Sequence, residues 1–251
     1  MRAFFENLKQ RSCPAIVLCL LIGFVSPSGF AQNGTPARKP AGNSRVLSAG
    51  FVCVEKVYNS ELMAPFDVLQ HTIYRDPKNY IRGFIVTPDG KPFLTSEGIR
   101  ITPDYSFADA PPIDILLIPS TETSMTADLE NVIFMDWLKR AIQNAQHVIT
   151  LCDGAFPLAA TGALDGRTAT TFPGDREEFA KRFPQIKVNF AANFVVDGKY
   201  ITSVGGAASY EPALYLLEKL YSREHAVLTG KGLVIDWDLQ KVPHLIVNEN
   251  K

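Results

Sequence analysis

One cysteine lies at the boundary between a strand pattern and a helix pattern. A thiol at such a position can be chemically reactive. Residues 149–157 read ITLCDGAFP, with Cys152 directly after a run of strand-forming residues. A thiol at the start of a helix lies near the positive end of the helix dipole and near backbone N–H groups, and both favour the thiolate. Asp153 opposes this if its carboxylate faces the sulfur, because a like charge raises the pKa of a thiol. Three interpretations of Cys152 stay open: a nucleophile, a redox sensor or a buried structural residue.

The elements on either side of the cysteine must form a sharp turn to present its side chain. We predict a strand over residues 147–151 and a helix over residues 154–163, with Pro157 early enough to be tolerated in the first turn. A strand that ends at a reactive residue and continues into a helix resembles a nucleophile elbow, which lifts the side chain to the C-terminal edge of a sheet.

From residue 46 onward, apolar runs alternate with helical patterns. Strands are predicted at residues 46–54, 80–87, 92–95, 113–119, 193–196 and 199–203. Helices are predicted at residues 60–72, 128–145, 175–182 and 210–222. This alternation predicts an α/β layered fold with a mostly parallel sheet.

Local signals refine these assignments. The turn Pro88-Asp89-Gly90 is expected to join the second and third strands, and Asp197-Gly198 predicts a hairpin between the last two. Asp128 is a suitable N-cap for the second of the helices. The tail at residues 232–238 either adds a strand or lies across the domain.

Composition and charge narrow the classes of protein. The chain has 251 residues, 46% of them hydrophobic, and a net charge of −1, so it can bury a full core in one or two domains. The sequence has no block of like charges and therefore gives no electrostatic footprint for nucleic acid. It also lacks a phosphate-binding glycine motif and a cluster with metal-ligand spacing. We expect a soluble protein that requires no cofactor and no metal.

The N-terminal segment is predicted to be a secretory signal peptide. Basic residues precede an apolar run at residues 14–25, and small residues follow up to Ala31. A run of about a dozen apolar residues fits a signal peptide better than a membrane span of roughly 20, so we predict cleavage after Ala31. An uncleaved anchor is the alternative. Residues 1–31 would be the signal peptide and 32–45 a linker, and the protein would be exported to the periplasm or the extracellular space, free of the membrane after cleavage.

The cysteines fall into two groups. Cleavage would remove Cys13 and Cys19 and leave Cys53 and Cys152 in an oxidising compartment. We expect these two to stay unpaired, because Cys53 lies in a predicted strand where a small buried hydrophobe is the ordinary occupant.

Several stretches of the chain resemble one known family. The segment 152–171, CDGAFPLAATGALDGRTATT, resembles the nucleophile-elbow region of the ThiJ/PfpI family, within the class I glutamine amidotransferase-like superfamily. Residues 61–69, ELMAPFDVL, resemble its acidic residue followed by Gly-Pro, with Ala64 in place of the glycine. Further matching stretches follow in the family's order at residues 102–107, 114–119 and 200–206. The resemblance spans residues 46–226 and is nearest to the branch of isonitrile hydratases and the ligand domains of AraC-type regulators.

This resemblance implies a flavodoxin-like three-layer sandwich that is commonly dimeric. The family domain would span residues 46–226, with 227–251 as a C-terminal extension. Cys152 would be the nucleophile and Glu61 the acid. A protonated carboxyl that donates a hydrogen bond to sulfur stabilises the thiolate and can pass a proton during addition to an electrophile. Alternatively, Glu61 is only a carboxylate that complements a helix N-terminus.

The chain departs from the family pattern at two places. Related sequences often carry a histidine after the Ala-Thr-Thr segment, where this chain has Phe172, and its own four histidines are poorly spaced to replace it. The loop after the strand 113–119 has Ser120-Thr121 where the family usually has Gly-Gly. The N–H groups of these two residues are candidates for an oxyanion site, with Asp153 and Gly154 as further pocket residues. A solvated polar loop is the alternative.

Three functions therefore remain open. The first is an exported, cofactor-free enzyme that hydrates or hydrolyses a small electrophile with Cys152 and Glu61. The second is a non-catalytic ligand-binding domain, and the third is a redox sensor oxidised at Cys152. We expect a small-molecule substrate or ligand and a homodimer.

Overall fold

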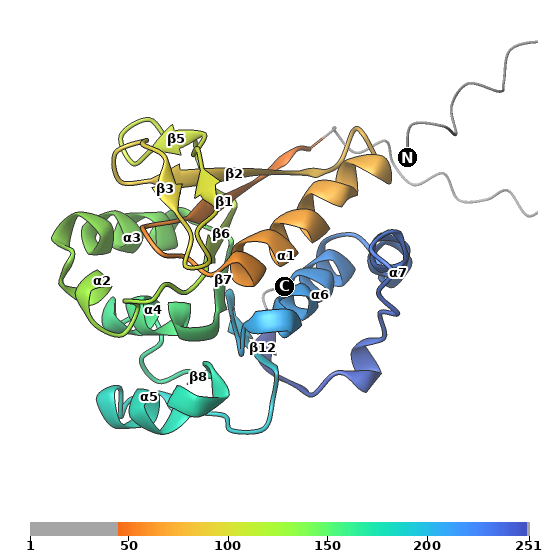
Figure 1. The fold of residues 1–251 in the computed structure, drawn as a ribbon. Coiled ribbons are helices and arrows are strands. Elements are labelled where there is room, and N and C mark those ends of the chain that lie inside the picture. Colours follow the sequence, from red (N-terminus) through yellow and green to blue (C-terminus); the bar gives the residue numbers. More distant parts are fainter. Residues whose placement is uncertain (1–44, 250–251) are drawn as a thin grey trace, which may run out of the picture. The chain divides into compact units, whose positions relative to one another are not determined.

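The computed structural model describes residues 45–249 (Figure 1). The predicted signal peptide and all of the predicted linker except Arg45 lie outside the described residues. Within the described part, no helix combines the length and the apolar character needed to cross a membrane.

An eight-stranded sheet forms the centre of the described domain, with the strand order β12-β10-β11-β7-β6-β1-β2-β5. Every neighbouring pair is parallel except β10 and β11. The strands are β1 (Leu47–Val52), β2 (Ile81–Thr87), β5 (Tyr105–Ser106), β6 (Ile115–Ile118), β7 (His147–Leu151), β10 (Phe194–Gly198), β11 (Tyr200–Ser203) and β12 (His244–Glu249). This sheet confirms the predicted mostly parallel α/β class.

Helices cover both faces of the sheet and make three layers (Figure 1). The helices are α1 (Asn59–Gln70), α2 (Ala127–Glu130), α3 (Val132–Asn144), α4 (Ala155–Ala160), α5 (Arg176–Arg182), α6 (Tyr210–Leu220) and α7 (Arg223–Gly232). Short 3-10 turns occur at η1 (His71–Tyr74), η2 (Cys152–Gly154), η3 (Pro173–Asp175), η4 (Gly206–Ser209) and η5 (Leu239–Lys241). Small two-stranded sheets pair β3 (Phe93–Leu94) with β4 (Arg100–Ile101), and β8 (Thr168–Ala169) with β9 (Lys187–Val188).

The apolar strands alternate between two cores, although their sequences show no polar alternation. In β6, Leu117 packs with α1 and α6 on one face, whereas Leu116 packs with α3 and α4 on the other. In β7, Ile149 and Val148 divide in the same way. Because successive strand residues point to opposite faces, a strand covered on both sides must be apolar throughout.

The predicted helix over residues 128–145 is broken in the structure. α2 ends at Glu130, and α3 starts again after Asn131, whose side chain accepts a hydrogen bond from the N–H of Phe134 at 3.1 Å. The prediction of Asp128 as the N-cap is therefore wrong. The buried Asp128 carboxylate instead accepts the hydroxyls of Thr121 and Thr123 at 2.6 and 2.8 Å.

The turn Pro88-Asp89-Gly90 does not create a hairpin between β2 and β3. Both edges of β2 already have parallel partners, β1 and β5, so β3 pairs with β4 in a separate sheet. The second predicted hairpin is confirmed, because β10 and β11 pair antiparallel around Asp197-Gly198.

The C-terminal tail contributes both a core segment and a strand. Trp237 lies in the core beside α6, with 5% of its surface exposed. The strand β12 then begins at His244, later than the apolar stretch at residues 232–238, and pairs parallel with β10.

Candidate functional site

Cys152 lies at a sharp turn between β7 and η2, which leads into α4. Its φ of 54° falls in the left-handed region, which is uncommon for a residue with a side chain. The neighbouring strands β6 and β11 end at the same edge of the sheet. The predicted elbow is therefore present, and it places the sulfur where several loops meet.

Two glycines make this turn sterically possible. A Cβ on Gly205, whose φ is 76°, would lie 2.4 Å from the Cβ of Cys152. A Cβ on Gly154 would lie 2.1 Å from the carbonyl oxygen of Ile118. Neither position has room for a side chain, so the sequence Cys-x-Gly at the elbow is a packing requirement as well as a turn signal.

Glu61 reaches the sulfur from the first turn of α1. Its carboxylate is buried and accepts hydrogen bonds from the N–H and the hydroxyl of Ser120, at 3.0 and 2.6 Å. Its other oxygen lies 3.5 Å from the N–H of Gly206, and the side chain hydrogen-bonds Cys152. Burial raises the pKa of Glu61, although these donors partly offset the effect. The structure therefore brings the two predicted catalytic residues together.

The thiol of Cys152 is largely withdrawn from solvent, with 8% of the residue exposed. Burial raises the pKa of this thiol, and the negative charges of Glu61 and Asp153 raise it further. Hydrogen bonding with the Ser120 side chain and the Asp153 backbone acts in the opposite direction. The effect of burial on the thiol pKa therefore exceeds that of the helix N-terminus, which in the sequence favours a thiolate.

Asp153 belongs to a second acidic pair beside the cysteine. Its Oδ1 accepts the hydroxyl of Thr171 at 2.9 Å, and its carboxyl hydrogen-bonds Asp175. Burial, followed by the charges of Asp175 and Glu61, raises the pKa of Asp153 to about 7. The sequence did not identify Thr171 or Asp175 as site residues, although both flank the position where related sequences carry a histidine.

The proposed oxyanion role of Ser120 and Thr121 meets a geometric obstacle. The N–H of Ser120 donates to Glu61, and the N–H of Thr121 donates to the hydroxyl of Ser124 at 2.8 Å. Neither backbone group is directed at a substrate oxygen in this arrangement. Ser120 instead contributes its hydroxyl to the Cys152–Glu61 pair.

None of the four histidines, all of which lie within the described residues, is positioned to replace the missing one. Phe172 is 45% exposed beside Thr171. His147 is at the start of β7, at the opposite end of that strand from Cys152. His225 and His244 stack on Tyr221 and Phe194, and His71 bonds the carbonyl of Asp67. The elbow therefore offers carboxyl groups and hydroxyls as its proton-carrying groups.

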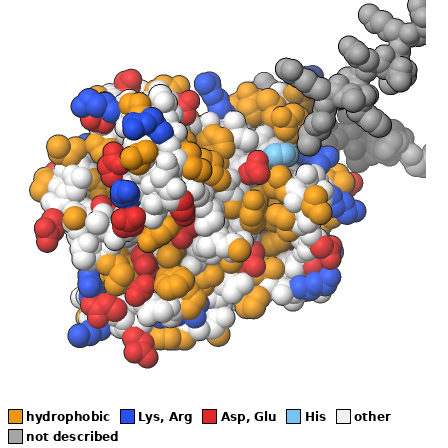
Figure 2. Space-filling view, viewed as in Figure 1, with side chains coloured by type: hydrophobic (Ala, Val, Ile, Leu, Met, Phe, Trp, Pro, Cys, Tyr) orange, Lys and Arg blue, Asp and Glu red, His pale blue; other side chains and the backbone are white. Residues whose placement is uncertain are grey.

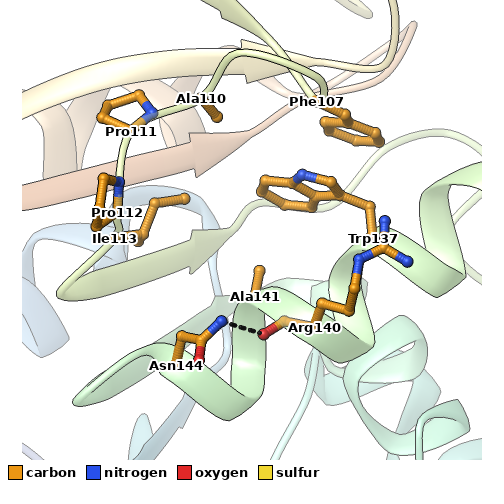
Figure 3. A pocket seen from close by; sticks show the side chains of 9 residues that line it. All are labelled: Phe107, Ala110, Pro111, Pro112, Ile113, Trp137, Arg140, Ala141 and Asn144. Atoms are coloured by element: carbon orange, nitrogen blue, oxygen red, sulfur yellow. Dashed lines mark hydrogen bonds between the residues drawn. The ribbon is translucent and has the colours of Figure 1, made fainter.

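Several larger hollows lie outside the Cys152–Glu61 contact. One, of about 550 Å³, is framed by the stacked rings of Phe107 and Trp137, whose centroids are 4.2 Å apart (Figure 3). Its lining is mainly apolar and includes none of the predicted site residues. A second, of about 400 Å³, lies at the C-terminal ends of β1 and β2, on the same sheet edge as the elbow.

The comparisons with known proteins agree with this architecture. The profile of the DJ-1/PfpI family matches residues 47–219. The chain is 27% identical over 183 residues to isonitrile hydratase of Pseudomonas putida, covering 72% of this chain and 75% of that protein. It is 28% identical over 154 residues to the HTH-type transcriptional regulator CdhR of Pseudomonas aeruginosa. That match covers 61% of this chain but only 45% of the regulator.

Solved structures share the fold at lower sequence identity. DJ-1beta of Drosophila melanogaster superposes with a TM-score of 0.66 at 23% identity, covering 77% of this chain and all of that one. A ThiJ/PfpI family protein from Pseudomonas syringae gives a TM-score of 0.68 at 20% identity, covering 84% of each chain. These likenesses establish the flavodoxin-like three-layer arrangement.

Proposed function

Because this chain belongs to the DJ-1/PfpI family, we propose that it is a cysteine-dependent enzyme that hydrates or hydrolyses a small electrophile. The observation that carries this proposal is the buried contact between Glu61 and Cys152 at the elbow. The curated relative named isonitrile hydratase supports the hydration chemistry.

The two residues would act through one shared proton. Burial raises the pKa of both groups and so favours the forms of the pair that carry a proton. In the proposed reaction, the thiol proton passes to the Glu61 carboxylate as the sulfur bonds to the electrophilic carbon. The Glu61 carboxyl then returns the proton to the substrate atom that has gained the electron pair. Water displaces the sulfur in a later step, and the thiol is restored.

A non-catalytic ligand-binding role is the second candidate. The withdrawn sulfur, its raised pKa and Phe172 in place of a histidine all favour it. The similarity to part of the regulator CdhR supports the same role. A redox sensor is less well supported, since oxidation of a cysteine depends on thiolate character and exposure.

The rate of alkylation of Cys152 at pH 7 is measured in the wild type and in Glu61→Gln. The direction in which the substitution changes this rate separates the candidates. If Glu61 accepts the thiol proton, the variant loses its base and the rate falls, by on the order of a hundredfold. If Glu61 is only a neighbouring negative charge, the variant lowers the thiol pKa and the rate rises. Glu224→Gln, at an exposed position on α7, is the matched control and should equal the wild type.

Turnover then distinguishes an enzyme from a binding domain. Isonitriles and α-ketoaldehydes are the first substrates to assay, and activity should disappear in Cys152→Ala. Binding of these compounds without turnover in the wild type would reject the enzymatic proposal.

We further propose that the protein is exported and acts as a homodimer. The basic and apolar pattern before Ala31 supports export, and N-terminal sequencing of the protein from its native host should begin at Gln32. A light-scattering mass of one chain in solution would reject the dimer.

A further inference from the structure

We propose that the Cys152 site accepts uncharged or cationic electrophiles and disfavours anionic ones. Acidic side chains lie close to the sulfur, and the guanidinium of Arg176, which follows them in the sequence, is engaged in other hydrogen bonds. The inference rests on the proposed function in taking Cys152 as the reacting residue. It adds the charge class of the substrate.

Three carboxyl groups lie along the elbow itself. Glu61 hydrogen-bonds the sulfur, and Asp153 follows Cys152 directly. Asp175 hydrogen-bonds Asp153 across the start of α5. Carboxyl groups carry either no charge or a negative charge, so this cluster never presents a positive charge to a ligand.

A fourth carboxylate, that of Glu122, lies on the segment after β6 that pairs with the segment before α1. The segment from Lys56 to Tyr58 runs antiparallel to the segment after β6, with the N–H of Tyr58 bonded to the carbonyl of Ser120 at 3.1 Å. The N–H of Glu122 bonds the carbonyl of Lys56 at the other end of this pairing, also at 3.1 Å. Glu122 is exposed, and its carboxylate accepts the hydroxyl of Ser96 at 2.7 Å.

The phenol of half-buried Tyr58 lies in an acidic environment, as the causes of its raised pKa indicate. Burial raises its pKa, and the charges that raise it further are those of Glu122, Cys152, Glu61 and Asp153. All four are acidic groups. The charges of Glu122 and of the elbow groups therefore both act on Tyr58.

The hollow of about 400 Å³ on the same sheet edge also has a mainly acidic set of charged side chains. Its charged side chains are those of Glu55, Asp89, Asp128 and Lys91. Lys91 is paired with Asp89 at 2.8 Å, so it offers little charge to an anionic ligand.

The basic residue closest in sequence to the elbow acids is turned into the protein. The guanidinium of Arg176 is buried and donates to the hydroxyl of Thr170 at 3.1 Å. It also donates to the backbone carbonyls of Phe190 and Ala192. These bonds tie the guanidinium to the loop before β10.

This local excess of acid does not reflect the composition of the chain. The sequence has 25 basic and 26 acidic residues, and both kinds are distributed over the face drawn in Figure 2. In a partly buried site the charges are screened less than at the surface, so they act strongly on a charged ligand. An anion would have to approach like charges there, whereas a cation would be attracted.

The experiment uses three thiosulfonate reagents whose transferred groups carry a positive charge, no charge or a negative charge. Methanethiosulfonates with a trimethylammonium group, an uncharged methyl group or a sulfonate group each react by the same displacement. The Cys152 sulfur forms a mixed disulfide, and methanesulfinate leaves. Rates at Cys152 in the full chain are measured by mass spectrometry of its peptide and divided by the rate of each reagent with 2-mercaptoethanol.

We expect the cationic reagent to be favoured over the anionic one by about tenfold or more at low ionic strength, and salt should reduce the preference. Glu122→Gln and Asp153→Asn should each lower the ratio of the two rates, whereas Glu224→Gln should not. A shift in thiol pKa would change all three rates together, so the ratio isolates the charge effect. Equal normalised rates in the wild type, or an unchanged ratio in both site variants, would overturn the inference.

This outcome is independent of the proposed catalytic activity. If the protein shows the charge preference but no turnover, the proposed charge selection stands and the proposed enzymatic activity is rejected. If the protein turns over anionic and cationic substrates equally well, the proposed enzymatic activity stands and the proposed charge selection is rejected.

Discussion

The hydroxyl of Ser120 contacts both members of the Cys152–Glu61 pair. It lies 2.6 Å from the carboxylate of Glu61 and also hydrogen-bonds the sulfur of Cys152. A hydroxyl has only one proton to donate, so it can follow the negative charge from the carboxylate to the thiolate. Hydrogen bonds to charged groups are the stronger ones. Ser120 is therefore a positioning residue that this chain has where the family usually has glycine.

Removing this hydroxyl should slow the reaction of the thiol. We expect Ser120→Ala to lower the alkylation rate of Cys152 at neutral pH by about tenfold, because a hydrogen bond to a charged group contributes about 1.5–3 kcal/mol. The pH profile of the rate should also move to higher pH. Ser120→Thr keeps the hydroxyl and should restore most of the rate. An alanine variant with the wild-type profile would show that the hydroxyl has no part in thiolate formation.

The raised pKa of Asp153, about 7, makes a prediction for stability. Between roughly pH 4 and pH 7 the native state binds more protons than the unfolded chain, so its free energy of unfolding falls as the pH rises. Asp153→Asn removes this dependence and should be stabilised relative to the wild type at pH 8. The difference in free energy of unfolding between Asp153→Asn and the wild type should change by on the order of 1 kcal/mol between pH 4 and pH 8. This figure follows from about 1.4 kcal/mol per pKa unit, reduced by partial solvent screening. Urea denaturation at several pH values measures it, and parallel curves would contradict the assignment.

At this scale the sequence predicted the main contact and missed its surroundings. Cys152 and Glu61 each lie beside a recognisable boundary between elements, and parallel strands bring such boundaries to one edge of the sheet. Asp175 and Tyr58 lie in segments whose paths depend on tertiary hydrogen bonds, such as the pairing of Tyr58 with Ser120. The spacing of residues in the sequence does not predict those hydrogen bonds.

The turn between β7 and α4 depends on close packing against the start of η4. Gly205→Ala would place a methyl group 2.4 Å from the Cβ of Cys152, in addition to requiring an alanine at a φ of 76°. We expect a loss of stability of about 3 kcal/mol or more, from strain and overpacking together. Gly166→Ala is a matched control with a φ of 74° and open space around it, so it should cost only about 1 kcal/mol. Chemical denaturation of both variants tests this, and equal losses would show that packing at the elbow contributes little.

The helix that is broken at Asn131 shows why element boundaries were less predictable than element types. Apolar spacing continues across residues 128–145, so periodicity alone predicts one helix. The capping signal was assigned to Asp128, but Thr121 and Thr123 occupy that carboxylate, and Asn131 caps the helix that follows. A residue with a strong capping propensity can thus be recruited by a loop that is close only in the folded chain.

At the scale of the domain, the fold was predictable because the sheet is buried on both faces. Continuous apolar runs at β6 and β7 indicated parallel central strands. The C-terminal extension was harder to place, because the region 232–238 is apolar enough for a strand but packs as an irregular segment. Its tryptophan lies in the same core as α6, although the family profile ends at residue 219.

The extension should therefore be an integral part of the domain. Trp237 is 5% exposed, and its indole N–H donates to Glu218 of α6 at 3.0 Å. Trp237→Ala should lower the free energy of unfolding by about 3–5 kcal/mol, since it leaves a large cavity and an unpaired carboxylate. Val234→Ala, at a residue 95% exposed in the same segment, should lose no stability. Urea denaturation followed by circular dichroism measures both, and a Trp237→Ala variant as stable as the wild type would show that the tail only rests on a domain that is complete without it.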